Sequence, residues 1–410
     1  MMCLRRAARR WAVVLAALAV PVTLASCAAG SAPAASGGDG RAAAASCATA
    51  ARAKWTAVEP VSPGSKNNDL TGVAVLSAGN AWAVGTYADA NDGAIGGQTL
   101  VEHWNGTAWS VVPSPDPGDS GDFLTAVSAV SPSAIWAVGE YESGGQSKTL
   151  IAEWNGTTWN QVASPSPGPD NYLTSVWAVS ANDAWAVGDY DNGPPGGSSL
   201  ILHWNGTRWA QVPSPDPGIR NELYSVTATS AASAWAVGSS GSQQAAWPFI
   251  LHWNGTAWTR VNAPHLTGTG GELLSVDATS ALNAWAAGDV SDSAGEHTLI
   301  LRWNGTAWTR VSSPDPEGPD IVDSLRGVAA TSASSAWAAG YISNGASYQS
   351  LILRWNGSAW TRAASPSPGA GGNLVAIAAS SPATAWAVGQ FGAVGSDDAF
   401  AVRYCTRAGR

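Results

Sequence analysis

Basic residues are scarce in this chain. It contains 20 lysines and arginines against 29 aspartates and glutamates. Four of the basic residues, Arg5, Arg6, Arg9 and Arg10, lie in the first ten positions, and without them 16 basic residues face 29 acidic ones, a net charge of −13. Proteins that bind nucleic acid neutralise phosphates with Lys and Arg. The charge balance therefore argues against a nucleic-acid partner.

The chain also lacks the short motifs of common chemistries. It has no serine nucleophile elbow, phosphate-binding loop, calcium-loop spacing or close run of metal ligands. We expect no cofactor, with Ca²⁺ at acidic loops as the one alternative left open, and no catalytic residue is assigned. Four residues from one part of the chain are the weak candidates for a metal site or for hydrolase or lyase chemistry: His265, His297, Glu272 and Glu296.

Long apolar runs are absent except near the N-terminus. The basic start is followed by an apolar stretch from Trp11 to Ala25, which is short for a bilayer span, and then by a small-residue site. These features predict an export signal. Leu24-Ala25-Ser26-Cys27 also resembles the bacterial lipobox, which implies cleavage before Cys27 and a lipid on its sulfur. The alternative is an ordinary cleaved signal peptide.

Cysteine is rare, with four residues in the whole chain. Cys3 leaves with the signal and Cys27 would carry the lipid, so Cys47 and Cys405 remain. Outside the cytoplasm two such thiols are expected to pair, and unpaired thiols are the alternative. The predicted organisation is a lipoprotein signal peptide (1–26), a flexible Ala/Ser/Gly-rich tether (27–53), a folded repeat domain (54–405) and a short tail (406–410).

What the chain has in abundance is one repeated block of about fifty residues. The strand-like run Ala-Trp-Ala-Val/Ala-Gly is followed by a polar loop and then by Trp-Asn-Gly-Thr/Ser-x-Trp, as around Trp136 and Asn155-Gly156. Asn-Gly between apolar runs predicts a β-hairpin with a type I′ turn. A further run, Leu-x-x-Val-x-Ala, precedes each block. Four short strands at this period predict a β-propeller.

The ends of the chain predict how the ring closes. Lys54-Trp55-Thr56 matches the last strand of later repeats but has no repeat before it, whereas the seventh repeat stops at Tyr404-Cys405 without its last strand. We therefore predict an all-β fold, a seven-bladed propeller of four-stranded antiparallel blades whose last blade is completed by the N-terminal strand. A disulfide between Cys47 and Cys405 would hold this closure.

The recurring text from Lys54 to Tyr404 resembles the secreted bacterial β-propellers grouped with galactose-oxidase/kelch-like and Asp-box propellers. Two departures are visible: the kelch double glycine is absent, and Trp-Asn-Gly-Thr-x-Trp lacks the Asp of an Asp-box. The resemblance implies a lipid-anchored propeller and says little about chemistry.

Long loops are predicted on one face of the ring only, where the second strand of each blade leads to the third and each blade leads to the next. Loops carry most binding sites, and these contain most of the acidic residues. Aromatic rings beside carboxylates suit the stacking and hydrogen bonding of sugars. The candidate ligand-binding residues on this face are Tyr87, Tyr141, Tyr190, Trp247, Tyr341, Phe391, Asp189 and Asp191, with blade packing as the alternative role for the aromatics.

Taken together, these features predict a non-catalytic binding or scaffold propeller, anchored to the outer face of the cytoplasmic membrane. Its partners would be the membrane, through the lipid anchor, and a glycan, cell-wall polymer or protein on the long-loop face. A protein-interaction scaffold and a carbohydrate-active enzyme with its site on that face are the alternatives. We expect a monomer.

Overall fold

The computed structural model describes residues 53–90, 96–193, 196–242, 245–293, 295–315, 321–345, 347–367, 371–393 and 396–405. They belong to one of the two compact units of the chain, Ala44–Arg410. Within these ranges no helix is long and apolar enough to cross a membrane. The predicted signal peptide, the tether up to residue 52, Cys27, Cys47 and the 406–410 tail lie outside the described residues, so these predictions stay predictions.

The described elements are β-strands, and they form antiparallel sets of four. Blades one to four consist of β2 (Asn67–Ser77), β3 (Asn80–Ala88), β4 (Gln98–Trp104) and β5 (Trp109–Val111); β6 (Asp122–Ser131), β7 (Ala134–Ser143), β8 (Gln146–Trp154) and β9 (Trp159–Gln161); β10 (Asn171–Ser180), β11 (Asp183–Tyr190), β12 (Ser198–Trp204) and β13 (Trp209–Gln211); and β14 (Arg220–Ser230), β15 (Ser233–Gly241), β16 (Ala246–Trp253) and β17 (Trp258–Val261).

Blades five to seven continue the pattern. They consist of β18 (Gly270–Ser280), β19 (Asn283–Asp292), β20 (Gly295–Trp303) and β21 (Trp308–Arg310); β22 (Val322–Ser332), β23 (Ser335–Ser343), β24 (Tyr348–Trp355) and β25 (Trp360–Ala363); and β26 (Asn373–Ser381), β27 (Thr384–Ala393), β28 (Ser396–Cys405) and β1 (Lys54–Ala57). A single parallel pair, Glu296 with Val322, joins blades five and six into one eight-stranded sheet.

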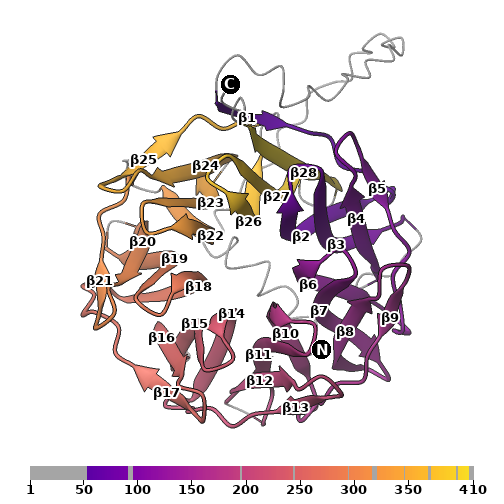
Figure 1. The fold of residues 1–410 in the computed structure, drawn as a ribbon, viewed down its shortest axis with the longest axis horizontal. Helices are drawn as coiled ribbons and strands as arrows, with labels where there is room; N and C mark the ends of the chain where they lie inside the picture. The colour runs from indigo at the N-terminus through magenta and orange to yellow at the C-terminus, as the bar shows by residue number, and fades with distance from the viewer. Residues whose placement is uncertain are drawn as a thin grey trace, which may run out of the picture. The chain divides into compact units, whose positions relative to one another are not determined.

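The first strands of the blades follow one another around a centre (Figure 1). Each contacts the first strand of the next blade, from β2 through β6, β10, β14, β18 and β22 to β26, and β26 contacts β2. The seven-bladed, all-β propeller predicted from the repeat is therefore confirmed.

The closure of the last blade is also confirmed. Strand β1 pairs antiparallel with β28, with Trp55 opposite Tyr404 and Lys54 opposite Cys405. Cys405 is disulfide-bonded. Its predicted partner, Cys47, is outside the described residues, so the pairing of these two cysteines stays a prediction.

A buried carboxyl group fastens the segment that follows β1. Glu102 in β4 is fully buried and stands where the other blades have Ala152 or a leucine, valine or similar apolar residue. Its Oε2 accepts a hydrogen bond from the backbone N–H of Val61 at 3.0 Å. Burial raises the pKa of Glu102 to about 7. The N-terminal segment is thus attached to blade one as well as to blade seven.

Tryptophan fills the space between blades. The buried apolar residues form seven clusters, and each cluster combines two consecutive blades. Between blades three and four, the ring of Trp185 lies 5.0 Å from that of Trp253 and 5.2 Å from that of Trp258, the latter nearly perpendicular. Perpendicular aromatic pairs are favourable, and they let an indole N–H face a neighbouring ring. The repeated tryptophans are therefore packing residues.

The Asn-Gly turns differ from the two-residue type I′ turns expected from the sequence. The last strand pair of blade two is Trp154 with Trp159, which leaves a four-residue turn. Oδ1 of Asn155 accepts hydrogen bonds from the backbone N–H groups of Thr157 and Thr158 at 2.9 and 3.0 Å, and Gly156 has a φ of 100°. Asparagine acts here through its side chain, which satisfies the turn amides and makes the longer turn stable.

The proline-rich links between blades are fixed by their own polar residues. In the first link, Oγ of Ser114 lies 2.6 Å from Oγ1 of Thr99, and Oδ1 of Asp116 accepts from the N–H of Thr99 at 2.7 Å. Ser214 and Asp216 contact Ser199 in the same way in the third blade. These contacts give the Pro-Ser-Pro segments a structural role.

The two ends of the strands define two sides of the ring. The turn side carries the first-to-second turns and the Asn-Gly turns of all blades. The loop side carries the second-to-third loops and the links between blades. Both sides are used below.

Candidate functional site

One repeated position separates the blades into two groups. Directly after the buried leucine of each first strand lies a β-bulge residue. In blades one to three it is threonine, and its hydroxyl donates to the leucine carbonyl of the next blade: Thr71 to Leu124 at 2.7 Å, Thr125 to Leu173 at 2.6 Å and Thr174 to Leu223 at 2.6 Å. The threonines therefore join neighbouring blades near the loop side.

In blades four to six the threonine is replaced, and blade seven has Val375 at the same position. The bulge residues are Tyr224, Leu274 and Arg326. Within the described residues, none of these side chains repeats the hydroxyl bridge to the next blade. Tyr224 and Arg326 are long and polar. Where repeats keep a residue for structure, a local departure of this kind marks a position that is free for function.

Tyr224 contributes to a polar network in blade four. Its hydroxyl donates to Oε2 of Glu222 at 2.6 Å and lies 3.3 Å from Oγ of Ser239. Oε1 of Glu222 accepts from Arg220 at 2.9 Å. Burial, followed by the nearby Glu272 and Glu222 carboxyl groups, raises the pKa of Tyr224. Its phenol therefore stays protonated and can donate.

Arg326 contributes from blade six. Its Nη2 donates to the hydroxyl of Tyr341 at 3.0 Å, and its guanidinium carbon lies 5.4 Å from the centre of that ring. Burial alone would lower the pKa of Arg326, but Tyr341, Asp289 and Glu272 outweigh it and raise the pKa. Arginine therefore remains a cation here.

Blade five supplies three carboxyl groups between these two networks. Glu272 in β18 is directly opposite Asp289 in β19, and Glu296 lies one strand further on, opposite Ser291. Oδ2 of Asp289 accepts from Oγ of Ser324 at 2.8 Å, and Asp289 and Glu296 also share a hydrogen bond. Oε1 of Glu296 is shielded from solvent and has no hydrogen-bond partner within the described residues.

The carboxyl groups resist ionisation. Burial, and next the charge of Asp289, raises the pKa of both Glu272 and Glu296 to about 8. Burial also raises the pKa of Asp289, against the favourable effect of Arg326. At neutral pH the two glutamates are therefore largely protonated. We call the residues Glu222, Tyr224, Glu272, Asp289, Glu296, Arg326 and Tyr341 the loop-side cluster.

This cluster combines hydrogen-bond donors and acceptors in a setting that is shielded from water. Tyr224, Arg326 and the protonated glutamates donate, and the carboxyl oxygens accept. Most members are half-buried, and Asp289 and Tyr341 are buried. Such a set suits a ligand with several hydroxyl groups, which needs both kinds of partner. In the part of the chain that the structure describes, no group of three or more His, Cys, Asp or Glu side chains is arranged to hold a metal ion.

The four residues grouped as weak metal candidates do not meet. Glu272 and Glu296 lie in the cluster, but His297 follows Glu296 on the strand and therefore faces the other way. Its Nδ1 lies 2.9 Å from Asp315 and its Nε2 3.2 Å from Asp292. Nδ1 of His265 lies 3.0 Å from the carbonyl of Leu266. Strand alternation separates the histidines from the carboxyl pair.

The predicted aromatic residues divide into two sets. Tyr341 comes one residue after the glycine of its second strand, whereas four others come two residues after it and so face the opposite way. Tyr341 is in the cluster. The other four pack against the clusters between blades: Tyr87, Tyr141, Tyr190 and Phe391. Their packing role is observed, and ligand binding by them stays a prediction.

Trp247 differs from the other predicted aromatics because it is exposed, at 37%. Ile219, in the segment before β14 of the same blade, is 54% exposed. Its backbone N–H donates to the carbonyl of Gly241, and Gly241 pairs with Ala246, the residue before Trp247. The Trp247 and Ile219 side chains are thus both exposed at the loop side of blade four, the blade that carries Tyr224.

The predicted acidic residues lie in blade three. Asp189 is buried at the repeat position that Asp289 occupies in blade five, opposite Ser199. Asp191 donates its backbone N–H to the carbonyl of Asp170 at 2.9 Å. The structure does not test whether either one binds a ligand. Arg326, Tyr224 and Asp289 were not predicted, although comparison of the bulge positions across the repeats would have singled out the first two.

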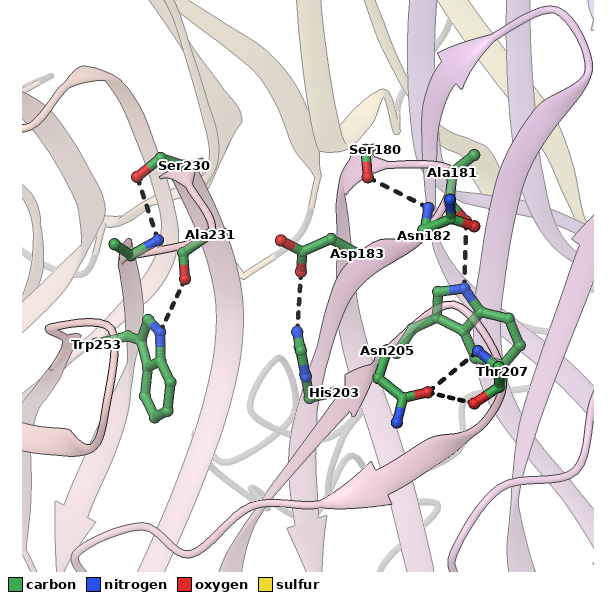
Figure 2. Close-up of polar contacts among 12 residues, drawn as sticks. Ser180, Ala181, Asn182, Asp183, His203, Asn205, Thr207, Ser230, Ala231 and Trp253 are labelled. Atoms are coloured by element: carbon green, nitrogen blue, oxygen red, sulfur yellow. Dashed lines mark hydrogen bonds and ion pairs between the residues drawn. The ribbon is translucent and has the colours of Figure 1, made fainter.

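The remaining histidines are on the turn side and stay apart. The ring of His203 lies 4.3 Å from that of Trp185, and its Nε2 lies 2.9 Å from Oδ1 of Asp183. Figure 2 shows this pair between two adjacent turns, where Trp253 donates to the carbonyl of Ala231. His103 and His252 stack on the tryptophans of their own blades in the same way. Each histidine covers a tryptophan, so the turn side has no histidine cluster.

A groove of about 310 Å³ lies on the outside of the ring between blades one and two. Pro113, Pro115, Trp154 and Trp159 form its apolar walls. It contains no charged residue, and it is separate from the loop-side cluster in blades four to six.

No protein-family model matches the chain, and no curated protein matches its sequence. Solved structures share its fold. The structure of YCF48 bound to D1 peptide matches with a TM-score of 0.53 and 16% identity over 86% of this chain and 97% of that one. The polysaccharide lyase PL25 ulvan lyase matches with a TM-score of 0.52 and 11% identity over 88% and 95%.

A third match is the extracellular domain of the putative hybrid two component system BT4673 from B. thetaiotaomicron. Its TM-score is 0.51 at 12% identity, over 86% of this chain and 42% of that one. Identities this low show a shared propeller fold, and the same fold serves peptide binding in one of these proteins and a polysaccharide lyase in another. The resemblance to kelch-like or Asp-box propellers in particular stays a prediction.

Proposed function

We propose that this protein is an extracytoplasmic binding propeller, attached through Cys27 to the outer face of the cytoplasmic membrane, which binds a glycan or cell-wall polymer at the loop-side cluster. The observation that carries the proposal is the replacement of the bridging threonine by Tyr224 and Arg326 on either side of the blade-five carboxyl groups. A sugar offers the hydroxyl groups that such donors and acceptors recognise.

The surroundings of the cluster support this ligand class. The exposed Trp247 and Ile219 lie on the loop side of blade four and provide the kind of apolar surface on which a sugar ring stacks. Because Glu272 and Glu296 are largely protonated at neutral pH, the cluster does not require a cation and accepts a neutral ligand.

The test is a variant that removes the binding groups and restores the regular blade. In Tyr224→Thr/Arg326→Thr, both bulge positions carry the residue of blades one to three, so the fold should be kept. We expect binding to cell-wall polysaccharide, measured by pulldown and on a glycan array, to fall at least tenfold. The control is Thr125→Val, which removes a bridge in blade two and should leave binding unchanged. Unchanged binding in the double variant would contradict the proposal.

One observation favours a second candidate, a carbohydrate-active enzyme. Glu272, Asp289 and Glu296 are adjacent carboxyl groups, and glycosidases use a protonated carboxyl group beside an ionised one. In that case Glu272→Gln should abolish polysaccharide cleavage and keep polysaccharide binding. Cleavage is measured as the release of new reducing ends. If the unaltered protein cleaves none of the polysaccharides that it binds, the enzyme candidate is rejected and the binding function remains.

A further inference from the structure

Arginine is distributed unevenly around the ring. The residue two places after the tryptophan of the outermost strand is Val111, Gln161 and Gln211 in blades one to three, and it is Arg260, Arg310 and Arg362 in blades four to six. The three arginines are exposed. Arg260 and Arg310 make no hydrogen bond or ion pair in the described part of the chain, and so they are not used to hold the fold.

The turn-side segments next to Arg260 and Arg310 contain no carboxylates, whereas Arg362 lies close enough to Asp323 to favour the ionised form of that carboxyl group. The first-to-second turns 230–233, 280–283 and 332–335 and the hairpins 253–261, 303–310 and 355–363 contain no Asp or Glu. The acidic residues of the same blades lie toward the loop side, apart from Asp277, which bonds the backbone of Ala278 and Ala330. Blades four and five are therefore basic at one end and acidic at the other.

An exposed leucine lies in the middle of this basic region. Leu282, in the turn between β18 and β19 of blade five, is 68% exposed. It lies beside Gly305 of the neighbouring Asn-Gly turn. The corresponding residues of other blades are small or polar, such as Ser133, Asn182, Ala232 and Ser334. A single apolar side chain among cations is typical of segments that enter a membrane interface.

The N-terminal part of the chain enters the structure next to the same region. Strand β1, with the exposed Lys54, is the outermost strand of blade seven, and it follows β17, β21 and β25 around the ring. The segment before Ala53 contains Cys27, which is expected to carry the lipid. A tether that starts at a membrane therefore ends beside the basic blades.

We propose that the turn side of blades four and five docks on a membrane surface rich in anionic lipid headgroups, with Arg260 and Arg310 contacting the headgroups and Leu282 entering the interface. The acidic loop side then faces away from the membrane. Each strand of about ten residues spans on the order of 30 Å, several Debye lengths at physiological ionic strength, so the acidic side is screened from the lipid surface. The loop-side cluster is thereby presented outward.

The experiment uses the full chain with Cys27→Ser, so that no lipid is attached and any binding comes from the protein surface. Co-sedimentation is measured with phosphatidylglycerol vesicles and with phosphatidylcholine vesicles. We expect binding to the former only, weakened by salt. Arg260→Gln/Arg310→Gln should weaken the partition constant on the order of 30-fold, since each arginine near an anionic surface contributes about fivefold.

Two controls separate docking from a general change of charge. Lys66→Gln/Lys148→Gln removes the same charge from the loop side and should leave vesicle binding unchanged. Leu282→Ser installs the residue found at this turn in blades two and six and should weaken binding about tenfold, the value of one buried leucine side chain. A dye on Leu282→Cys should report an apolar environment when vesicles are added.

Three results would overturn the proposal. The first is equal binding to both kinds of vesicle. The second is an equal loss of binding in the arginine and lysine double variants. The third is retention on a soluble polyanion such as polyphosphate with no vesicle binding, which would identify a soluble anionic partner instead of a membrane.

Discussion

Blades one to three and blades four to six have the same strands and the same tryptophan packing, but they differ at two repeat positions, one half-buried and one exposed. Near the loop side, threonine bridges in the first group give way to Tyr224, Leu274 and Arg326 in the second. On the outer strand, valine and glutamine give way to arginine. The comparison shows that the repeats keep their buried tryptophan packing. Their sequences vary at positions where side chains contact solvent or the carbonyl of a neighbouring blade.

The largest effect should be equal in the two groups. Trp136 in blade two and Trp285 in blade five are both fully buried. Replacing either with alanine should lower the free energy of unfolding by about 3–5 kcal/mol, because each leaves a cavity between blades. Urea unfolding checks this. A much smaller loss for Trp285→Ala would show that the two groups of blades differ in their cores as well.

The second-largest effect should be a pH dependence of the unfolding free energy that arises in blade five. The ordinary glutamate pKa is 4.5, and in the folded protein Glu272 and Glu296 titrate near 8. Between these values the folded state holds more protons than the unfolded one, so this contribution to stability is largest at low pH and is lost as the pH rises to about 8. We expect a fall of several kcal/mol over this range, because each pH unit by which a pKa is raised contributes up to about 1.4 kcal/mol for each group.

Glu272→Gln/Glu296→Gln should flatten the curve of unfolding free energy against pH between about pH 5 and pH 8. The matched change in blade one, Glu102→Gln, should act at lower pH, because Glu102 titrates near 7. If the glutamine pair leaves the curve as steep as before between pH 7 and 8, the two carboxyl groups are not shielded as described.

A smaller effect is expected at the bulge. Thr125→Val removes the hydroxyl that bonds the carbonyl of Leu173, and it should cost about 1 kcal/mol. Leu274→Thr in blade five introduces such a hydroxyl and should be neutral or slightly stabilising. Thermal unfolding of both variants measures the value of the bridge, and a destabilised Leu274→Thr would mean that the leucine has a packing role of its own.

The smallest effect is expected on the outer strand. Arg310→Gln should change the free energy of unfolding by less than about 0.5 kcal/mol, since the side chain is exposed and has no partner in the described residues. The matched change Gln211→Arg in blade three should be equally neutral. A clear loss of stability in Arg310→Gln would indicate a structural role for the arginine.

The propeller and its closure were predictable because they depend on local patterns. The strand at Trp55 has no repeat before it, and the strand at Tyr404 has no strand after it. Pairing the two strands covers the open edge of the last blade, and the structure shows this pairing. The turn type was predicted wrongly, because the reach of the Asn155 side chain to two amides depends on the register of Trp154 and Trp159.

The candidate site was predicted only in part. Glu272 and Glu296 meet in the cluster, whereas His297 faces away from them, since adjacent residues of a strand point to opposite faces. Tyr341 was grouped with Tyr87, Tyr141 and Tyr190, although one residue of offset after the glycine reverses its direction. The networks around Tyr224 and Arg326 join three blades that are about fifty residues apart in sequence, so no local pattern contains them.

By itself, the sequence determined the number of blades, the four strands in each and the exchange of a strand between the chain ends, because repeats and hairpins are encoded in short segments. The tertiary structure decided which polar residues meet. Burial between blades then set their ionisation, because the pKa of a carboxyl group depends on charges and solvent brought near it by the whole ring.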